Sequence, residues 1–123
     1  MTVYSEGRHA AEFVLSEANG GRSRDTITIV SGAGVVKVGT VLGKITASGK
    51  YTPSPATGAD GAQTGAAVIL YEVDATSADV AVAAIVRHAE VNKNLLVYEA
   101  TVDQPAEKVT KNGELATAGI LAR

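Results

Sequence analysis

The sequence VVKVGTVLGKITASGKY, residues 35–51, sets the pattern for the whole chain. Apolar side chains alternate along it, and glycines interrupt the alternation at Gly39, Gly43 and Gly49. Such a pattern is typical of short, half-buried strands that bend sharply. Its only charged residues are three lysines, with no acid or base beside them for catalysis. We interpret the stretch as structural scaffold.

The composition of the 123-residue chain favours one small β-rich domain. Hydrophobic residues make up 46% of it but aromatic residues only 4%, so alanine and branched aliphatic residues must fill the core. With 13 glycines as well, this composition favours a turn-rich β fold over a helical bundle. We therefore predict a mainly β domain, a small barrel or sandwich of short strands, with one C-terminal helix.

Charge and cysteine content narrow the possible functions. A net charge of −2 with scattered lysines and arginines argues against a direct nucleic-acid partner. The absence of cysteine excludes disulfides, thiolate catalysis and cysteine metal sites. The first residues contain no apolar signal region and no long apolar run follows, so we expect neither export nor membrane insertion. We expect the chain to be made and used in the cytoplasm, or assembled there into something larger.

Three segments carry the strongest strand patterns. Asp25–Val30 alternates strictly and predicts a strand with Ile27 and Ile29 facing the core. Ala66–Asp74 is a continuous apolar run that predicts a central buried strand, and Val80–Val86 predicts the returning strand of a hairpin. A helix over Val80–Arg87, capped by Asp79, is the alternative, but β-branched residues favour the strand.

The remaining segments alternate between turns and short elements. Phe13–Leu15 predicts a short apolar anchor and Ser16–Arg24 a cluster of turns. Thr52–Gly65 predicts a surface loop, because its prolines cannot donate to a central ladder. We further predict a turn at Ala89–Asn94, a strand at Leu95–Val102 and a last strand at Ile120–Ala122. Between them we predict a helix from Gln104 to about Ala116, because Asp103 is a good N-cap and Pro105 suits the first turn of a helix.

The two ends of the chain differ in character. Residues 1–12 are mostly polar without a clear period, which predicts a flexible N-terminal arm, and residues 13–123 form a single domain. If Thr2, Val3, Tyr4 and Ser5 pair as an edge strand with a partner, the arm provides a binding segment.

No catalytic or metal-binding constellation is evident in the sequence. His9 and His88 lack a partner at ligand or triad spacing. Glu72 and Asp74 share one face of a predicted strand, where they more often keep an outward face soluble than act as an acid and a base. We therefore predict no enzyme activity, no metal and no cofactor.

The segment VKVGTVLGKI resembles the V-x-x-G-x-V-L-G hairpin of biotinyl and lipoyl carrier domains. Those domains present a modified lysine within an E-A-M-K or D-K-A type sequence. Here the hairpin continues as Thr46-Ala47-Ser48-Gly49-Lys50, with neither motif, so only Lys50 is a candidate acceptor. A carrier or small-molecule-binding β domain is the alternative function.

Six ordered segments resemble the lambda-type head decoration proteins of tailed bacteriophages. The segments, which span nearly the whole chain from Phe13, are LSEANG with RSRD (residues 15–25), GTVLGKI (39–45), DG with TGAAVIL (60–70), VDAT (73–76), RHAEVN (87–92) and residues 115–121. The resemblance implies a β-clip-like domain with one helix. It also implies a homotrimer at local three-fold positions on the outer surface of the expanded virion capsid, where it stabilises the major capsid protein against the pressure of packaged DNA.

The resemblance implies as well that the N-terminal arm becomes ordered on the capsid by adding a strand to the major capsid protein. Three-fold symmetry would let apolar faces of neighbouring copies bury each other. Our candidates for that contact are Val68, Leu70, Val80 and Val82.

Overall fold

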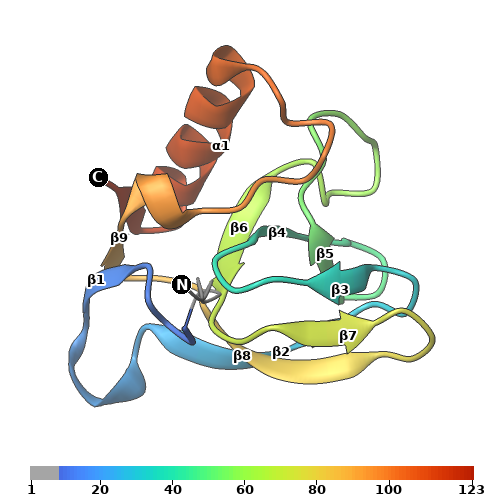
Figure 1. The fold of residues 1–123 in the computed structure, drawn as a ribbon, viewed down its shortest axis with the longest axis horizontal. Helices are drawn as coiled ribbons and strands as arrows, with labels where there is room; N and C mark the ends of the chain where they lie inside the picture. Colours follow the sequence, from blue (N-terminus) through green and yellow to red (C-terminus); the bar gives the residue numbers. More distant parts are fainter. Residues whose placement is uncertain (1–8) are drawn as a thin grey trace, which may run out of the picture.

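The computed structural model describes residues 9–123. The predicted binding segment of Thr2, Val3, Tyr4 and Ser5 therefore lies outside the described residues. Ten strands, one α-helix and two 3-10 turns make up the described chain (Figure 1). In order they are β1 (Val14–Glu17), η1 (Asn19–Gly21), β2 (Arg24–Ile29), β3 (Gly34–Val36), β4 (Val41–Lys44), β5 (Tyr51–Pro53), β6 (Gly65–Ile69), β7 (Val73–Ala75), β8 (Val80–Ile85), β9 (Ala89–Val91), η2 (Lys93–Leu95), α1 (Pro105–Thr117) and β10 (Ile120–Ala122). The prediction of a mainly β chain with a single C-terminal helix is confirmed.

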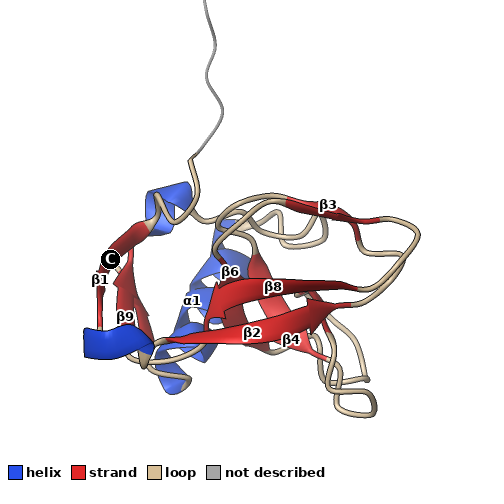
Figure 2. Cartoon of the chain, turned by 90° about the horizontal axis from the view of Figure 1, so that it is seen from below, coloured by secondary structure: helices blue, strands red, loops and turns tan. Residues whose placement is uncertain are grey.

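Five strands pair in a ring, in the order β2, β5, β4, β6 and β8. The longest ladder is antiparallel and joins β2 to β8 over six residue pairs, from Arg24–Ile85 to Ile29–Val80. The ring is closed by one parallel bridge between Ile29 and Tyr51. Figure 2 shows β2 and β8 lying side by side along the ring.

Strands β4 and β6 bury side chains on both of their faces. Successive side chains of a strand point to opposite sides of the sheet. In β6, Ala67 and Ile69 point into the ring, beside Leu42 and Ile29, while Val68 packs into a second cluster outside the ring. A strand covered on both faces reads as a continuous apolar run, which accounts for the uninterrupted sequence AAVIL.

The second cluster lies between the ring and a three-stranded sheet in which β9 pairs with β1 on one side and β10 on the other. Phe13, Val91, Ile120 and Leu115 of α1 meet there, each at most 1% exposed. Helix α1 packs against β6 and β10 and covers this end of the molecule (Figure 1). The cluster therefore joins residues from both ends of the described chain.

Several predicted elements are confirmed by the structure. The strand at Asp25–Val30 appears as β2, with Ile27 7% and Ile29 0% exposed. The glycine-interrupted stretch forms short strands, and Val80–Ile85 is a strand rather than the alternative helix. The C-terminal helix occupies Pro105–Thr117, but its N-cap is Gln104 instead of Asp103, because the Glu107 side chain accepts a hydrogen bond from the Gln104 N–H at 3.1 Å.

The predicted continuous strand at Ala66–Asp74 is wrong. The chain bends at residues 70–72 and starts the separate strand β7, which pairs with β3 through Val36 and Val73. β6 still pairs antiparallel with β8, as predicted, but over two residue pairs only. No glycine or proline marks the bend in the sequence, so the non-local pairing of β7 with β3 decides where the strand ends.

Two predictions in the region of residues 89–102 are also wrong. Ala89–Asn94 is not a turn, because its first three residues form β9, which is paired on both sides. Leu95–Val102 is not a strand: Val97 makes a single parallel bridge with Thr40. The chain then turns, and the Val102 N–H donates to the Glu99 carbonyl at 2.8 Å.

The predicted surface loop at Thr52–Gly65 is correct only in part. Tyr51–Pro53 forms β5, with Pro53 opposite Leu42. Ser54 and Ala62 are each 1% exposed, and the Ser54 hydroxyl donates to the Ala62 carbonyl at 2.7 Å. The loop is therefore folded back onto the domain.

Candidate functional site

The structure places the four candidate trimer-contact residues in or against the core of a single chain. Val68 and Leu70 are fully buried and Val82 is 7% exposed, while Val80 packs against the cluster inside the ring. In a single chain these four side chains therefore contribute to the interior packing of the domain. The large apolar side chains that are exposed among the described residues are Leu15, Val35, Tyr71, Val109 and Leu121.

The described part of the predicted arm is a turn held against the domain. The Ala11 N–H donates to the Leu70 carbonyl at 3.0 Å, and the Val14 N–H donates to the Ala11 carbonyl at 3.1 Å. The Glu12 side chain accepts a hydrogen bond from the His9 N–H at 3.3 Å.

The other residues considered for chemistry lie apart from one another. Glu72 is exposed in the bend before β7, and Asp74 accepts hydrogen bonds from the Thr76 N–H and hydroxyl, which lower the pKa of its carboxyl. Lys50 follows the turn between the antiparallel strands β4 and β5, where its ammonium group lies 2.7 Å from Asp79. The segment VKVGTVLGKI does not itself form the hairpin that the likeness to carrier domains predicts, because β3 pairs with β7 and β4 pairs with β5. The candidate acceptor Lys50 is held in an ion pair.

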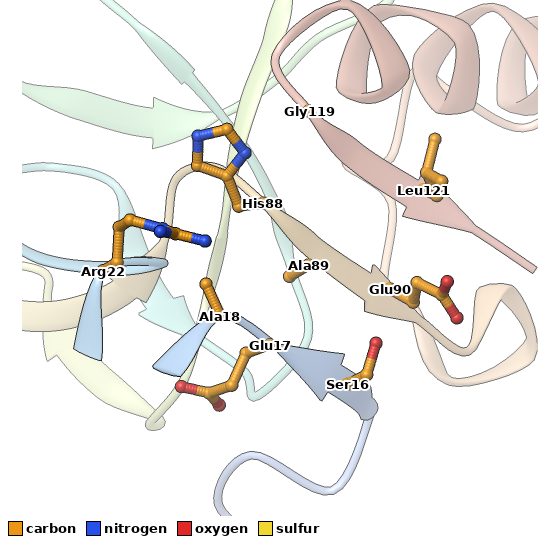
Figure 3. A pocket seen from close by; sticks show the side chains of 9 residues that line it. All are labelled: Ser16, Glu17, Ala18, Arg22, His88, Ala89, Glu90, Gly119 and Leu121. Atoms are coloured by element: carbon orange, nitrogen blue, oxygen red, sulfur yellow. The ribbon is translucent and has the colours of Figure 1, made fainter. Parts of the chain in front are cut away.

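A shallow cleft of about 330 Å³ lies at the Glu17 end of β1 (Figure 3). Its walls are the end of β1 with the turn after it, the start of β9 including Glu90, and the residues around the start of β10, where Leu121 lies at one margin. Arg22 and His88 are both exposed, and Figure 3 shows their side chains close to each other at one end of the cleft. Sequence analysis considered His88 singly and interpreted Arg22 only as part of a turn.

One buried hydroxyl connects the two walls of this cleft. Ser23 is fully buried, and its Oγ accepts a hydrogen bond from the Ala18 N–H at 2.9 Å while donating to the His88 carbonyl at 2.7 Å. The backbone of His88 has φ of 51°, in the left-handed region that residues other than glycine rarely adopt. The serine therefore holds an unusual backbone conformation in place.

Ion pairs surround the cleft. Arg24 binds Glu17 through two hydrogen bonds of 2.8 Å, and these bonds lower the pKa of the Glu17 carboxyl. Because the folded pKa lies below the unfolded one, the pair stabilises the domain at neutral pH, and this contribution is lost as the pH falls through the folded pKa. Arg87 donates to Asp25 at 2.6 Å and to the Arg22 carbonyl at 2.8 Å.

Replacing Ser23 with alanine is expected to lower the free energy of unfolding by about 1–3 kcal/mol, because the Ala18 N–H and the His88 carbonyl lose their shared partner. Urea unfolding followed by circular dichroism measures the change. Ser16→Ala is the matched control, since Ser16 is exposed at the same cleft, and a change of at most about 0.5 kcal/mol is expected for it. Equal losses in the two variants would contradict the role given to Ser23.

The described residues contain no group of three or more acidic, histidine or cysteine side chains placed to hold a metal ion. Within residues 9–123, no helix is long and apolar enough to span a bilayer. The surface of the described residues carries a shallow cleft, exposed apolar side chains and the open edges of short sheets. Such features are typical of domains that bind other proteins.

Comparison with known proteins gives the family. The model of the family of bacteriophage lambda head decoration protein D matches residues 3–120, and the chain belongs to this family. It is thus a structural protein of the bacteriophage head, located on the capsid of the virion. No individual curated protein matches the chain.

Proposed function

We propose that this chain binds as a homotrimer to local three-fold positions on the outside of the expanded capsid. There it holds neighbouring subunits of the major capsid protein against the pressure of packaged DNA. The observation that carries the proposal is the family match over residues 3–120, which covers almost the whole chain and includes most of the predicted arm.

In this proposal residues 2–5 of each copy add a strand to the major capsid protein. Each hydrogen bond of such a strand contributes about 0.5–1.5 kcal/mol, so one short arm binds weakly. Three arms in one trimer act together, because binding of the first raises the effective concentration of the others. The hydrogen bond from Ala11 to Leu70 supports this arrangement, since it fixes the domain close to the point where the arm begins.

The trimer contact is proposed to form from exposed apolar side chains. Val109, 70% exposed on α1, and Val35, 57% exposed on β3, are the most exposed of them among the described residues. Burial of such side chains against a second copy removes apolar surface from water, at a gain of roughly 25 cal/mol per Å².

Co-sedimentation with capsids of the encoding phage tests the proposed function. We expect saturable binding to expanded, undecorated shells in multiples of three per site, and no binding to unexpanded shells. A chain lacking residues 1–8 is expected to remain folded, because Ala11 and its hydrogen bond to Leu70 are retained, but to lose shell binding. Failure of the full chain to bind expanded shells would overturn the proposal. Unchanged binding by the shortened chain would show that the arm is not part of the contact with the capsid.

A further inference from the structure

We infer that the cleft at the Glu17 end of β1 binds a carboxylate group on a segment of the major capsid protein, with Arg22 as its principal contact. The inference rests on the function proposed above and adds a second contact to that of the arm. It follows from the ion pairs, the local charge and the backbone geometry around the cleft.

Arg22 differs from the other described arginines in having no carboxylate partner. Arg24 pairs with Glu17, Arg87 with Asp25, and Arg123 with Glu90 at 3.3 Å. The Arg22 guanidinium group has no such partner among the described residues, and the backbone carbonyl of Arg22 accepts a hydrogen bond from Arg87. A guanidinium group presents a planar fork of donors that matches a carboxylate in two parallel hydrogen bonds, so the free fork of Arg22 defines the chemical class of its ligand.

The surroundings of the cleft are basic although the chain is acidic. In and around the cleft, four arginines, Arg22, Arg24, Arg87 and Arg123, face three carboxylates, Glu17, Asp25 and Glu90, which leaves one positive charge. The whole chain has a net charge of −2. An acidic segment is therefore attracted to this part of the surface and not to the chain in general.

The walls of the cleft are held together by contacts within the chain itself. The Ser23 hydroxyl connects its two walls, and a Cβ placed on Gly119 would lie 3.2 Å from the His88 nitrogen, so the backbone on that side is closely packed. His88 also lines the cleft, and Figure 3 shows its imidazole and the side chain of Arg22 on the same side of it. A site formed in advance loses less conformational entropy on binding.

The position of the cleft indicates the capsid protein as the source of the carboxylate. Strand β1 has four residues, about 13 Å of extended chain. The arm joins the domain just before the start of β1, and Arg22 lies beyond its other end. The point where the arm joins the domain is therefore about the length of β1 from the cleft, so a capsid protein that holds the arm is tethered close to it.

The test is binding of Arg22→Glu to expanded shells, compared with Lys37→Glu. Both variants change the charge by the same amount, and Lys37 is an exposed side chain between β3 and β4, outside the cleft. For Arg22→Glu the Kd is expected to rise by about tenfold or more, because a charge-assisted pair becomes a repulsion. For Lys37→Glu a change within about twofold is expected, since salt screens exposed charges beyond about 8 Å. Thermal unfolding and native mass spectrometry confirm that each variant is folded and show its oligomeric state.

Three results would overturn the inference. Unchanged binding by Arg22→Glu would exclude the cleft from the contact, and equal losses in both variants would show a general effect of charge. Dissociation of the oligomer by Arg22→Glu would place the carboxylate on a second copy of this chain. Absence of binding by the unaltered chain is a separate outcome, because it removes the proposed function and the inference with it.

Discussion

Replacing Gly43 with alanine is expected to lower the free energy of unfolding by about 3 kcal/mol or more. A Cβ on Gly43 would lie 1.9 Å from the Ala62 carbonyl oxygen and 2.7 Å from its Cα. These are backbone atoms of the loop after β5, which the Ser54 hydroxyl holds in place. Because no side-chain rotation relieves the contact, the loop has to move away from β4. Urea unfolding followed by circular dichroism measures the loss.

Gly113→Ala is the matched control for this change. Gly113 lies exposed in α1, and a Cβ there meets no atom within 4 Å. Alanine in an exposed helix interior is more stable than glycine by about 1 kcal/mol, so this variant is expected to gain stability. Opposite signs for the two substitutions would support the close contact at Gly43, whereas two gains would show that the loop does not lie over β4.

Replacing Lys111 with methionine is expected to destabilise the domain by about 2–4 kcal/mol, the second of the two largest effects. Lys111 is 2% exposed, and its ammonium group donates to the Ser54 hydroxyl at 2.9 Å and to the Gln63 carbonyl. Glu114 lies 3.4 Å away. Methionine retains most of the volume but leaves the Gln63 carbonyl and Glu114 without this cation. Thermal and urea unfolding of the variant measure the cost.

Lys108→Met in the same helix is the control. Lys108 is exposed, with its ammonium group 5.6 Å from the centre of the Tyr98 ring, and the expected loss is at most about 1 kcal/mol. Similar losses in the two variants would mean that the buried ammonium group does not hold the loop to the helix.

The sequence analysis succeeded where local pattern and local structure agree. The alternation of Thr and Ile predicts β2, Pro105 predicts the start of α1 within one residue, and the glycines of residues 35–51 mark the bends between short strands. The family followed from six short segments in order, which no single motif would have identified.

The errors arise where partners distant in sequence determine the structure. Ala89–Val91 has no strand pattern of its own and becomes β9 because β1 and β10 pair with it on both sides. The contacts of Lys111 with Ser54 and Gln63 join residues far apart in the sequence, and only the fold brings them together. In the candidate cleft, the sequence shows Arg22 and His88 but not the buried hydroxyl of Ser23, which connects residues 18 and 88.

The placement of β9 between β1 and β10 also has a consequence for the time at which the protein folds. The sheet unites residues 14–17, 89–91 and 120–122, and its inner face completes the cluster around Phe13. The ring of β2, β4, β5, β6 and β8 needs no residue after Ile85 for its strands and can form earlier on the ribosome. The sheet can close only after residues 120–122 have been synthesised, and contacts across such long sequence separations form slowly. The cleft, which β10 helps to line, is therefore absent from the nascent chain until residues 120–122 have been synthesised.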